Sequence, residues 1–277
     1  MKRSRIGLIA VLALLLVLAF GMQVSAAESK TVNYKKHTDK MTVSLSGKWT
    51  ATSNKDWITV KKSGSTLKIT IKKNKSDERS GKVKVKNSKG EVKMTIKITQ
   101  GAYNIIDDRF EYDWKAAAKK YNKTDVTTKF LKKVIKVADA LGCPPDDLMT
   151  VMAFESSLNH KAVNPNSGAT GLIQFIPSTA ARLGTSCSAL KSMSAVKQLD
   201  YVKKYLAAFG KLENLGDLYM AILWPQGVGK KDSYVLWRSG SGEYERNSNL
   251  DVNNDGKVTR KECLKKVLKK RKEFVGE

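Results

Sequence analysis

The 277-residue sequence has few residues of the kinds that bind zinc or form disulfides, and few acidic residues. Three Cys and two His exclude a disulfide-dense small domain and a zinc site built from clustered Cys and His ligands. The chain has 26 Asp and Glu against 51 Lys and Arg, so its formal net charge is +25. Hydrophobic residues make up 41% of it, too many for a disordered basic tail. The sequence therefore predicts a folded protein with an anionic partner: nucleic acid, a membrane or another acidic polymer.

A long apolar run is found at the N-terminus. Lys2, Arg3 and Arg5 precede the run from Ile6 to Phe20, and small residues follow at 25–27. This pattern predicts a signal peptide over 1–27, cut after Ala26 or Ala27. An uncleaved anchor is the alternative, although the run is short of the roughly 20 residues of a membrane span. Either way the rest lies outside the cytoplasm, so we expect a secreted protein with no nucleic-acid partner and no stable membrane span after cleavage.

Residues 28–102 alternate between apolar and polar with a period of two, and turn residues separate the runs. They hold 19 basic and 6 acidic residues, a net charge of +13. Several short alternating strands at this spacing are typical of a β-sandwich. The alternating apolar positions are Met41, Val43, Leu45, Leu67, Ile69, Ile71, Val83, Val85, Val92, Met94, Ile96 and Ile98.

Particular residues of this region resemble the BACON domain, a family with an immunoglobulin-like sandwich that is often proposed to bind carbohydrate. The matching positions are Trp49, Asp56-Trp57-Ile58-Thr59-Val60, Gly64, Asn74, Arg79-Ser80-Gly81 and Thr99-Gln100-Gly101. The two tryptophans are expected in the core, with a sugar-stacking surface as the alternative. The lysine-rich face is a solvated surface, or a weak contact for anionic wall polymers or other glycans.

The period changes after residue 102, and the second half predicts helices and no strands. Residues 103–124 are expected to be a linker, with a short helix around 113–121. The helical domain is expected over 125–277, and its first amphipathic helix ends at Gly142. Pro144 and Pro145 suit the first turn of the next helix. We therefore expect two segregated domains, β followed by α.

Glu155 stands where an apolar residue would be expected. It continues the stripe of Leu148, Val151 and Met152 near the end of the second helix. Apolar surroundings and the negative end of the helix dipole both raise the pKa of a carboxyl group. A Glu that stays protonated near neutral pH can serve as a general acid. A partly exposed helix-end Glu without a role is the alternative.

The residues that follow resemble the soluble lytic transglycosylase (SLT) domain, which is related to goose-type lysozyme. The resemblance rests on Glu155-Ser156-Ser157-Leu158-Asn159, Asn164-Pro165 and the run from Ser167 to Ala180. It implies that Glu155 is the sole catalytic acid/base and that Gln174 and Asn164 face the glycan. Tyr219 retains the tyrosine of a third family motif, although Met220 replaces its Asn. The segments 219–225, 228–230 and 232–236 resemble a phage-associated branch of these proteins.

The resemblance implies cleavage of the β-1,4 bond between N-acetylmuramic acid and N-acetylglucosamine in peptidoglycan, and hence a wall-associated protein. Glu155 would protonate the glycosidic oxygen and then draw the proton from the muramoyl 6-hydroxyl, which closes a 1,6-anhydro ring. Hydrolysis as in a muramidase needs a second carboxylate, for which Asp200, Asp217, Glu243 and Glu245 are candidates. A non-catalytic protein that holds peptidoglycan or another glycan is a further alternative.

Residues 251–262 have the order of ligands found in an EF-hand calcium loop. Oxygen ligands fall at Asp251, Asn253 and Asp255, the carbonyl of Lys257 follows, and Glu262 closes the loop. We expect one structural calcium ion there, with a metal-free turn as the alternative. The predicted fold class is thus multi-domain β + α: an immunoglobulin-like β-sandwich, then a mainly α-helical lysozyme-like domain with an EF-hand-like calcium loop.

The few Cys and His residues give weaker expectations. Cys143, Cys187 and Cys263 are an odd set, of which one pair, such as Cys143 with Cys187, could form a disulfide in an exported chain. His37 and His160 have no evident partner in the sequence and are expected at the surface.

Overall fold

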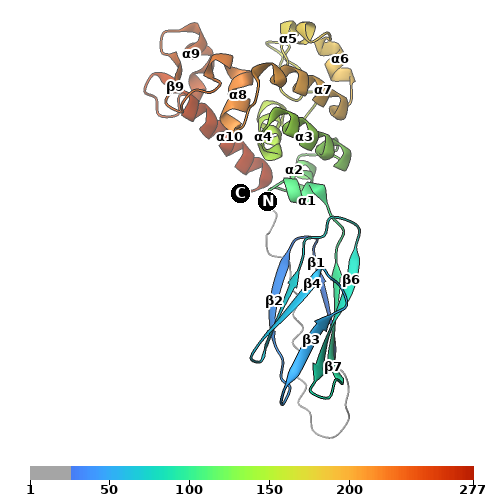
Figure 1. Cartoon of the computed structure of the whole chain (residues 1–277). Helices are drawn as coiled ribbons and strands as arrows, with labels where there is room; N and C mark the ends of the chain where they lie inside the picture. Colours follow the sequence, from blue (N-terminus) through green and yellow to red (C-terminus); the bar gives the residue numbers. More distant parts are fainter. Residues whose placement is uncertain (1–25) are drawn as a thin grey trace. The chain divides into compact units, whose positions relative to one another are not determined.

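The computed structural model describes residues 26–277, which divide after Asn104 into a β unit and a helical unit (Figure 1). The predicted signal peptide lies outside the described residues except for Ala26 and Ala27, with which the first strand begins. Within residues 26–277, no helix is long and apolar enough to cross a membrane. Each unit is described by itself below.

The β unit consists of two sheets. The larger sheet has the strand order β1-β7-β6-β3, and the smaller has the order β2-β5-β4. β1 pairs with β7 in parallel, and the other neighbours are antiparallel. The predicted N-terminal β-sheet region is therefore confirmed, while its finer assignment to an immunoglobulin-like sandwich remains a prediction. The strands are β1 (Ala26–Val32), β2 (His37–Thr42), β3 (Trp49–Ser53), β4 (Ile58–Ser63), β5 (Thr66–Ile71), β6 (Arg79–Asn87) and β7 (Val92–Gln100).

One apolar core lies between the two sheets, and both predicted core tryptophans belong to it. Trp49 is 5% exposed and Trp57 is 8% exposed. Basic side chains cover their rings, because Lys62 Nζ lies 4.4 Å from the ring centre of Trp49 and the guanidinium of Arg79 lies 4.3 Å from that of Trp57. Burial and these cations leave neither indole as a platform for a sugar ring. The period-two pattern fills the rest of this core with Val43, Ile58, Leu67, Ile69, Ile71, Val83, Val85, Ile96 and Ile98.

The helical unit contains ten α-helices and a small two-stranded sheet among the described residues. The sheet, β8 with β9, departs from the expectation that this half holds no strand. Its two strands are too short for an alternating pattern to be recognised in sequence. The elements are α1 (Ile105–Arg109), α2 (Trp114–Lys120), α3 (Thr128–Leu141), α4 (Pro145–Ser156), α5 (Pro177–Arg182), α6 (Cys187–Ser192), α7 (Ala195–Leu206), α8 (Leu215–Leu223), β8 (Val235–Arg238), α9 (Gly242–Asn247), β9 (Lys257–Thr259) and α10 (Arg260–Val275).

The segment 103–124, predicted as a linker, instead packs into the helical unit through α1 and α2. Trp114 is fully buried, and its indole N–H donates to Asp146 Oδ1 at 2.6 Å. The backbone N–H of Glu111 donates to the other oxygen of Asp146 at 2.7 Å. Because Asp146 stands in the first turn of α4, these bonds attach the segment to the central helix.

Two expectations about Cys and His also change. All three cysteines are free thiols, and burial raises the pKa of Cys143 and of Cys263 to about 12. No disulfide therefore joins Cys143 to Cys187 within residues 26–277. His160, expected at the surface, is 4% exposed, and its Nδ1 lies 3.1 Å from a carboxylate oxygen of Asp125. The sequence did not show this partner because it lies 35 residues away.

Candidate active site

Helix α4 carries Glu155 in its last turn. Proline at the first helical position starts the helix, and Ser157 ends it in a left-handed conformation with φ 51°. The helix is apolar on nearly all sides and packs against α3, α8 and α10. Glu155 itself is partly buried, and desolvation raises the pKa of its carboxyl group to about 7. The apolar environment expected from the sequence is therefore present.

The hydroxyl of Ser156 ties the end of α4 to the loop that follows. Ser156 Oγ lies 3.0 Å from the carbonyl oxygen of Met152 and 3.0 Å from that of Leu172. The first acceptor lies within the helix, and the second lies 16 residues later. This side chain therefore fixes the loop against the turn of α4 that presents Glu155.

The loop from 164 to 175 is compact and holds two of the predicted cleft residues. Asn164 is exposed, and its Oδ1 accepts from the backbone N–H of Asn166 and of Ser167. Thr170 and Phe175 exchange two backbone hydrogen bonds of 2.9 Å. Gln174 stands between them with φ 54°, and its Nε2 donates to Gly171 O at 3.0 Å. Both predicted residues thus shape the loop that Ser156 attaches to α4, while their contact with glycan stays a prediction.

Gln198 on α7 supports the same loop through a hydrogen bond to Leu172. This residue was not identified from the sequence. Its side chain is fully buried; its Oε1 accepts from Leu172 N at 2.6 Å, and its Nε2 donates to His160 O and Leu190 O. A Cβ on Gly171, where φ is 88°, would lie 2.5 Å from Gln198 Oε1. Position 171 therefore favours glycine for two reasons: its positive φ, and the lack of space for a Cβ beside Gln198. The available signal was a polar residue on an apolar stripe, the same signal that identified Glu155.

The negative charge of Glu155 contributes to the raised pKa of two tyrosines, Tyr219 and Tyr205. Tyr219 on α8 is 2% exposed, and its ring meets that of Phe154 edge to face at 5.2 Å. Burial raises the pKa of Tyr219 well above its usual value, and the charge of Glu155 raises it further. The pKa of Tyr205 is raised by burial too; nearby Arg182 opposes that rise and Glu155 adds to it. Predicted Tyr219 thus packs against Phe154, the residue before Glu155. Tyr205, which the sequence did not single out, donates its hydroxyl to Ala221 O on α8 at 2.8 Å.

The four candidates for a second carboxylate do not shift the pKa of Glu155, for which burial is the cause. Asp200 is paired with Lys133. Asp217 accepts from Arg260 Nη2 at 3.0 Å and from Gly229 N at 2.8 Å. Glu243 lies 3.5 Å from Arg246 Nη2, and Glu245 is on the same short exposed helix. Three of the four thus already have basic partners.

The predicted calcium loop is closed by its own hydrogen bonds. Asp251 and Glu262 are buried, and Val252 N donates to Glu262 Oε1 at 3.0 Å, so the two ends of the loop meet. Asp251 accepts from the backbone N–H of Asp255 and of Gly256, where φ is 77°. Within residues 26–277 no three carboxylate, histidine or cysteine groups gather at one point. The donor types and turn fit calcium, but these carboxylates contact backbone amides.

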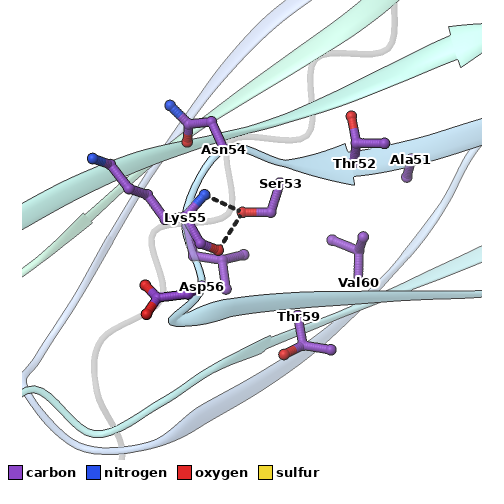
Figure 2. A pocket seen from close by; sticks show the side chains of 9 residues that line it. Ala51, Thr52, Ser53, Asn54, Lys55, Asp56, Thr59 and Val60 are labelled. Atoms are coloured by element: carbon purple, nitrogen blue, oxygen red, sulfur yellow. Dashed lines mark hydrogen bonds between the residues drawn. The ribbon is translucent and has the colours of Figure 1, made fainter.

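An open hollow of about 580 Å³ lies in the β unit, far along the sequence from Glu155. Figure 2 shows that the side chains around it come from β3, β4 and the turn between them. Ser53 Oγ is already engaged there with the backbone N–H and C=O of Lys55, each at 3.0 Å. Asp56 is the acidic residue of the lining and lacks a second acid or a histidine beside it, so the hollow has no catalytic arrangement.

Two family models match the chain, in the predicted order. Residues 47–101 match BACON, described as "Putative binding domain, N-terminal". Residues 132–208 match SLT, described as "Transglycosylase SLT domain", and include Glu155, the loop and Gln198. The chain thus matches the BACON family model first and the SLT family model after it. No curated protein matches it.

Two solved structures resemble part of this chain. One is a Bacteroides ovatus GH5 xyloglucanase in complex with a XXXG heptasaccharide, at 17% identity and a TM-score of 0.26. That match covers 32% of this chain and 19% of the xyloglucanase chain. The other is the NMR structure of a protein from Bacteroides thetaiotaomicron, at 18% identity and a TM-score of 0.24, covering 27% of this chain and 77% of that one. The chain thus spans about a fifth of the length of the xyloglucanase.

Proposed function

We propose that this protein is an exported lytic transglycosylase that cuts the β-1,4 bond between N-acetylmuramic acid and N-acetylglucosamine in peptidoglycan. The SLT domain supports a peptidoglycan-acting enzyme at the level of the family. The observation that carries the proposal for this chain is the environment of Glu155, whose pKa is raised to about 7 by burial. At neutral pH such a carboxyl group is protonated in a large share of molecules, as a general acid requires.

In the proposed reaction Glu155 works alone. It gives its proton to the glycosidic oxygen, and the bond from that oxygen to the muramoyl C1 breaks. The resulting carboxylate then takes the proton of the muramoyl 6-hydroxyl, whose oxygen forms the new bond to C1. Ser156 and Gln198 hold the loop, and Gln174, Asn164 and Tyr219 are proposed to contact the glycan.

Ring closure is favoured over hydrolysis by the surroundings of the other acids. A hydrolase of the inverting type places a second carboxylate roughly 6.5–9.5 Å from the acid, where it activates water. Asp200, Asp217 and Glu243 have basic partners instead, and none of the candidate carboxylates is a cause of the raised pKa of Glu155. The muramidase alternative therefore lacks an evident base.

We also propose that the loop 251–262 binds a structural calcium ion. Asp251, Asn253, Asp255, the Lys257 carbonyl and Glu262 would hold it, and Asp255 would have to turn from the backbone N–H of Lys257 that it now accepts from. The ion would neutralise the loop carboxylates. Arg260, two residues before the end of this loop, joins it to α8 through Asp217, so the loop supports the helix that carries Tyr219.

Replacing Glu155 tests the catalytic proposal. Purified wild-type protein and Glu155→Gln are compared for release of soluble fragments from peptidoglycan. We expect release by wild type and loss of about 100-fold or more in the variant, since one proton donor contributes 10²–10⁴-fold. Glu213→Gln, a matched change of an exposed acid, should leave the rate unchanged. Equal release by wild type and Glu155→Gln, or none by either, rejects the proposal.

A further inference from the structure

The smaller sheet of the β unit carries a row of three lysines that crosses all of its strands. Lys68 on the central strand β5 is directly opposite Lys40 on β2 and Lys61 on β4. All three side chains are exposed. Because neighbouring strands lie about 4.8 Å apart, the Cα atoms of the row span about 10 Å. We call Lys40, Lys61 and Lys68 the lysine row.

Hydroxyl side chains flank the lysine row on both sides of the same face. Thr38, Thr70 and Thr59 are opposite one another in the registers two residues away, and Thr38 Oγ1 lies 3.5 Å from Thr70 Oγ1. In the other direction, Thr66 is opposite Thr42 and Ser63. The nine positions of this face therefore hold three lysines, five threonines and one serine, and no carboxylate.

This arrangement is costly for the fold, since like charges directly opposite on a sheet repel each other. None of the three lysines has an ion-pair partner among residues 26–277. The nearest acid in sequence, Asp39, points away and pairs with Lys30 at 2.9 Å. Lys62 shows the contrast, because its Nζ donates to Trp49 O at 3.0 Å and covers the Trp49 ring. The lysine row thus presents three charges that the fold itself does not use.

We infer that the lysine row binds a linear phosphodiester polymer laid across the strands. An ammonium group is a point charge that suits the single negative charge of each phosphodiester, whereas carboxylate recognition favours the forked guanidinium of arginine, which this face lacks. The threonine hydroxyls can donate to phosphate oxygens on either side of the row. The face is exposed, so binding would be electrostatic and salt-dependent. This role is separate from the cleavage proposed for the helical unit.

Binding to linear poly(glycerol phosphate), measured by calorimetry on the full chain, tests this inference. The variant Lys40→Gln/Lys61→Gln/Lys68→Gln should bind about tenfold or more weakly than wild type, and its plot of log K against log salt should be shallower by about 2–3. The control Lys82→Gln/Lys84→Gln/Lys97→Gln removes the same charge from the exposed face of the larger sheet. It should lose less than about threefold.

Three outcomes would overturn the inference. Equal losses in the two triple variants would mean that net charge binds the polymer without the row. Equal affinity for polygalacturonate, which carries carboxylates, would remove the preference for phosphodiesters. No binding by wild type at low salt would leave the row without this partner. The single variant Lys68→Gln should lose affinity in part and keep or raise the melting temperature, which separates weaker binding from misfolding.

Discussion

The hydroxyl of Ser156 lies 3.0 Å from the carbonyl oxygen of Leu172 and joins the residue after Glu155 to the loop from 164 to 175. This hydrogen bond holds the end of α4, which carries Glu155, against a loop from a different segment of the chain. The position of the carboxyl group thus depends on a side chain that need not touch the substrate. We therefore propose Ser156 as a positioning residue for Glu155.

We expect Ser156→Ala to lower kcat about tenfold, because a small displacement of a reacting group is costly, and to change KM little. The protein should also lose about 1 kcal/mol of unfolding free energy with the hydrogen bonds. Peptidoglycan turnover and urea unfolding measure the two effects. Ser192→Ala is the control, since Ser192 also bonds to a carbonyl four residues earlier but lies on exposed α6. An unchanged kcat in Ser156→Ala contradicts the positioning role.

The fit of Gly171 against Gln198 predicts a stability difference between two glycine variants. Gly184 also has a positive φ, 76°, but a Cβ there would meet nothing within 4 Å. Gly184→Ala should therefore cost about 1 kcal/mol of unfolding free energy, from backbone strain. Gly171→Ala adds the contact with Gln198 and should cost at least about 2 kcal/mol more. Similar unfolding curves for the two variants would show that Gln198 moves aside freely.

The raised pKa of Glu155 predicts how the stability of Glu155→Gln depends on pH. Its folded-state pKa of about 7 lies above the ordinary value of 4.5, so the folded state holds the proton more tightly. The group's contribution to stability is therefore present below pH 4.5 and falls as pH rises toward and through 7. Glu155→Gln should match wild type at pH 4 and be more stable at pH 8 by roughly 1–3 kcal/mol. Equal unfolding free energies at pH 8 would show that the carboxyl group is well solvated.

The same pKa predicts the pH dependence of turnover. Because the general acid must carry its proton, kcat/KM should fall as pH rises through about 7. Rates measured between pH 5 and 9, on wild-type protein that remains folded, give this profile. A rate that stays level up to pH 9 argues against Glu155 as the acid.

Calcium should raise the melting temperature of the full chain. A ligand that binds the folded state at 100 times its Kd adds about 2.7 kcal/mol to the unfolding free energy. Scanning calorimetry with calcium, with magnesium and with chelator measures the shift, which should be smaller for magnesium. Glu262→Gln should reduce the calcium response. A melting temperature that does not change with calcium or chelator contradicts the proposed site.

Sequence patterns were sufficient to predict an element or an environment where apolar residues recur at the regular spacing of a strand or a helix. Alternation identified the strands of the β unit, and the stripe of Leu148, Val151 and Met152 identified the apolar environment of Glu155. The patterns failed where the deciding partner lies far away in sequence. Trp114 donates to Asp146, so a segment predicted as a linker belongs to the helical unit. His160, predicted at the surface of the helical domain, is buried, and its Nδ1 lies 3.1 Å from a carboxylate oxygen of Asp125.

In the candidate site too, local features could be predicted from the sequence and contacts between distant residues could not. The Glu155 block could be recognised from local residues, because they follow one another in a specific order. Gln198 could not be connected with it, since its bonds to Leu172 and His160 exist only after α7 packs beneath the loop. The roles of Gln174, Asn164 and Tyr219 toward glycan remain predictions.

Mass spectrometry of the fragments released from peptidoglycan tests the central claim most directly. Wild-type protein is predicted to release muropeptides that end in 1,6-anhydro-N-acetylmuramic acid. Each is lighter than the corresponding hydrolysed product by one water molecule, about 18 Da. Glu155→Gln is predicted to release almost none under the same conditions. Fragments from wild type that carry reducing ends instead, or anhydro fragments in equal amount from Glu155→Gln, would contradict ring closure by a single acid/base.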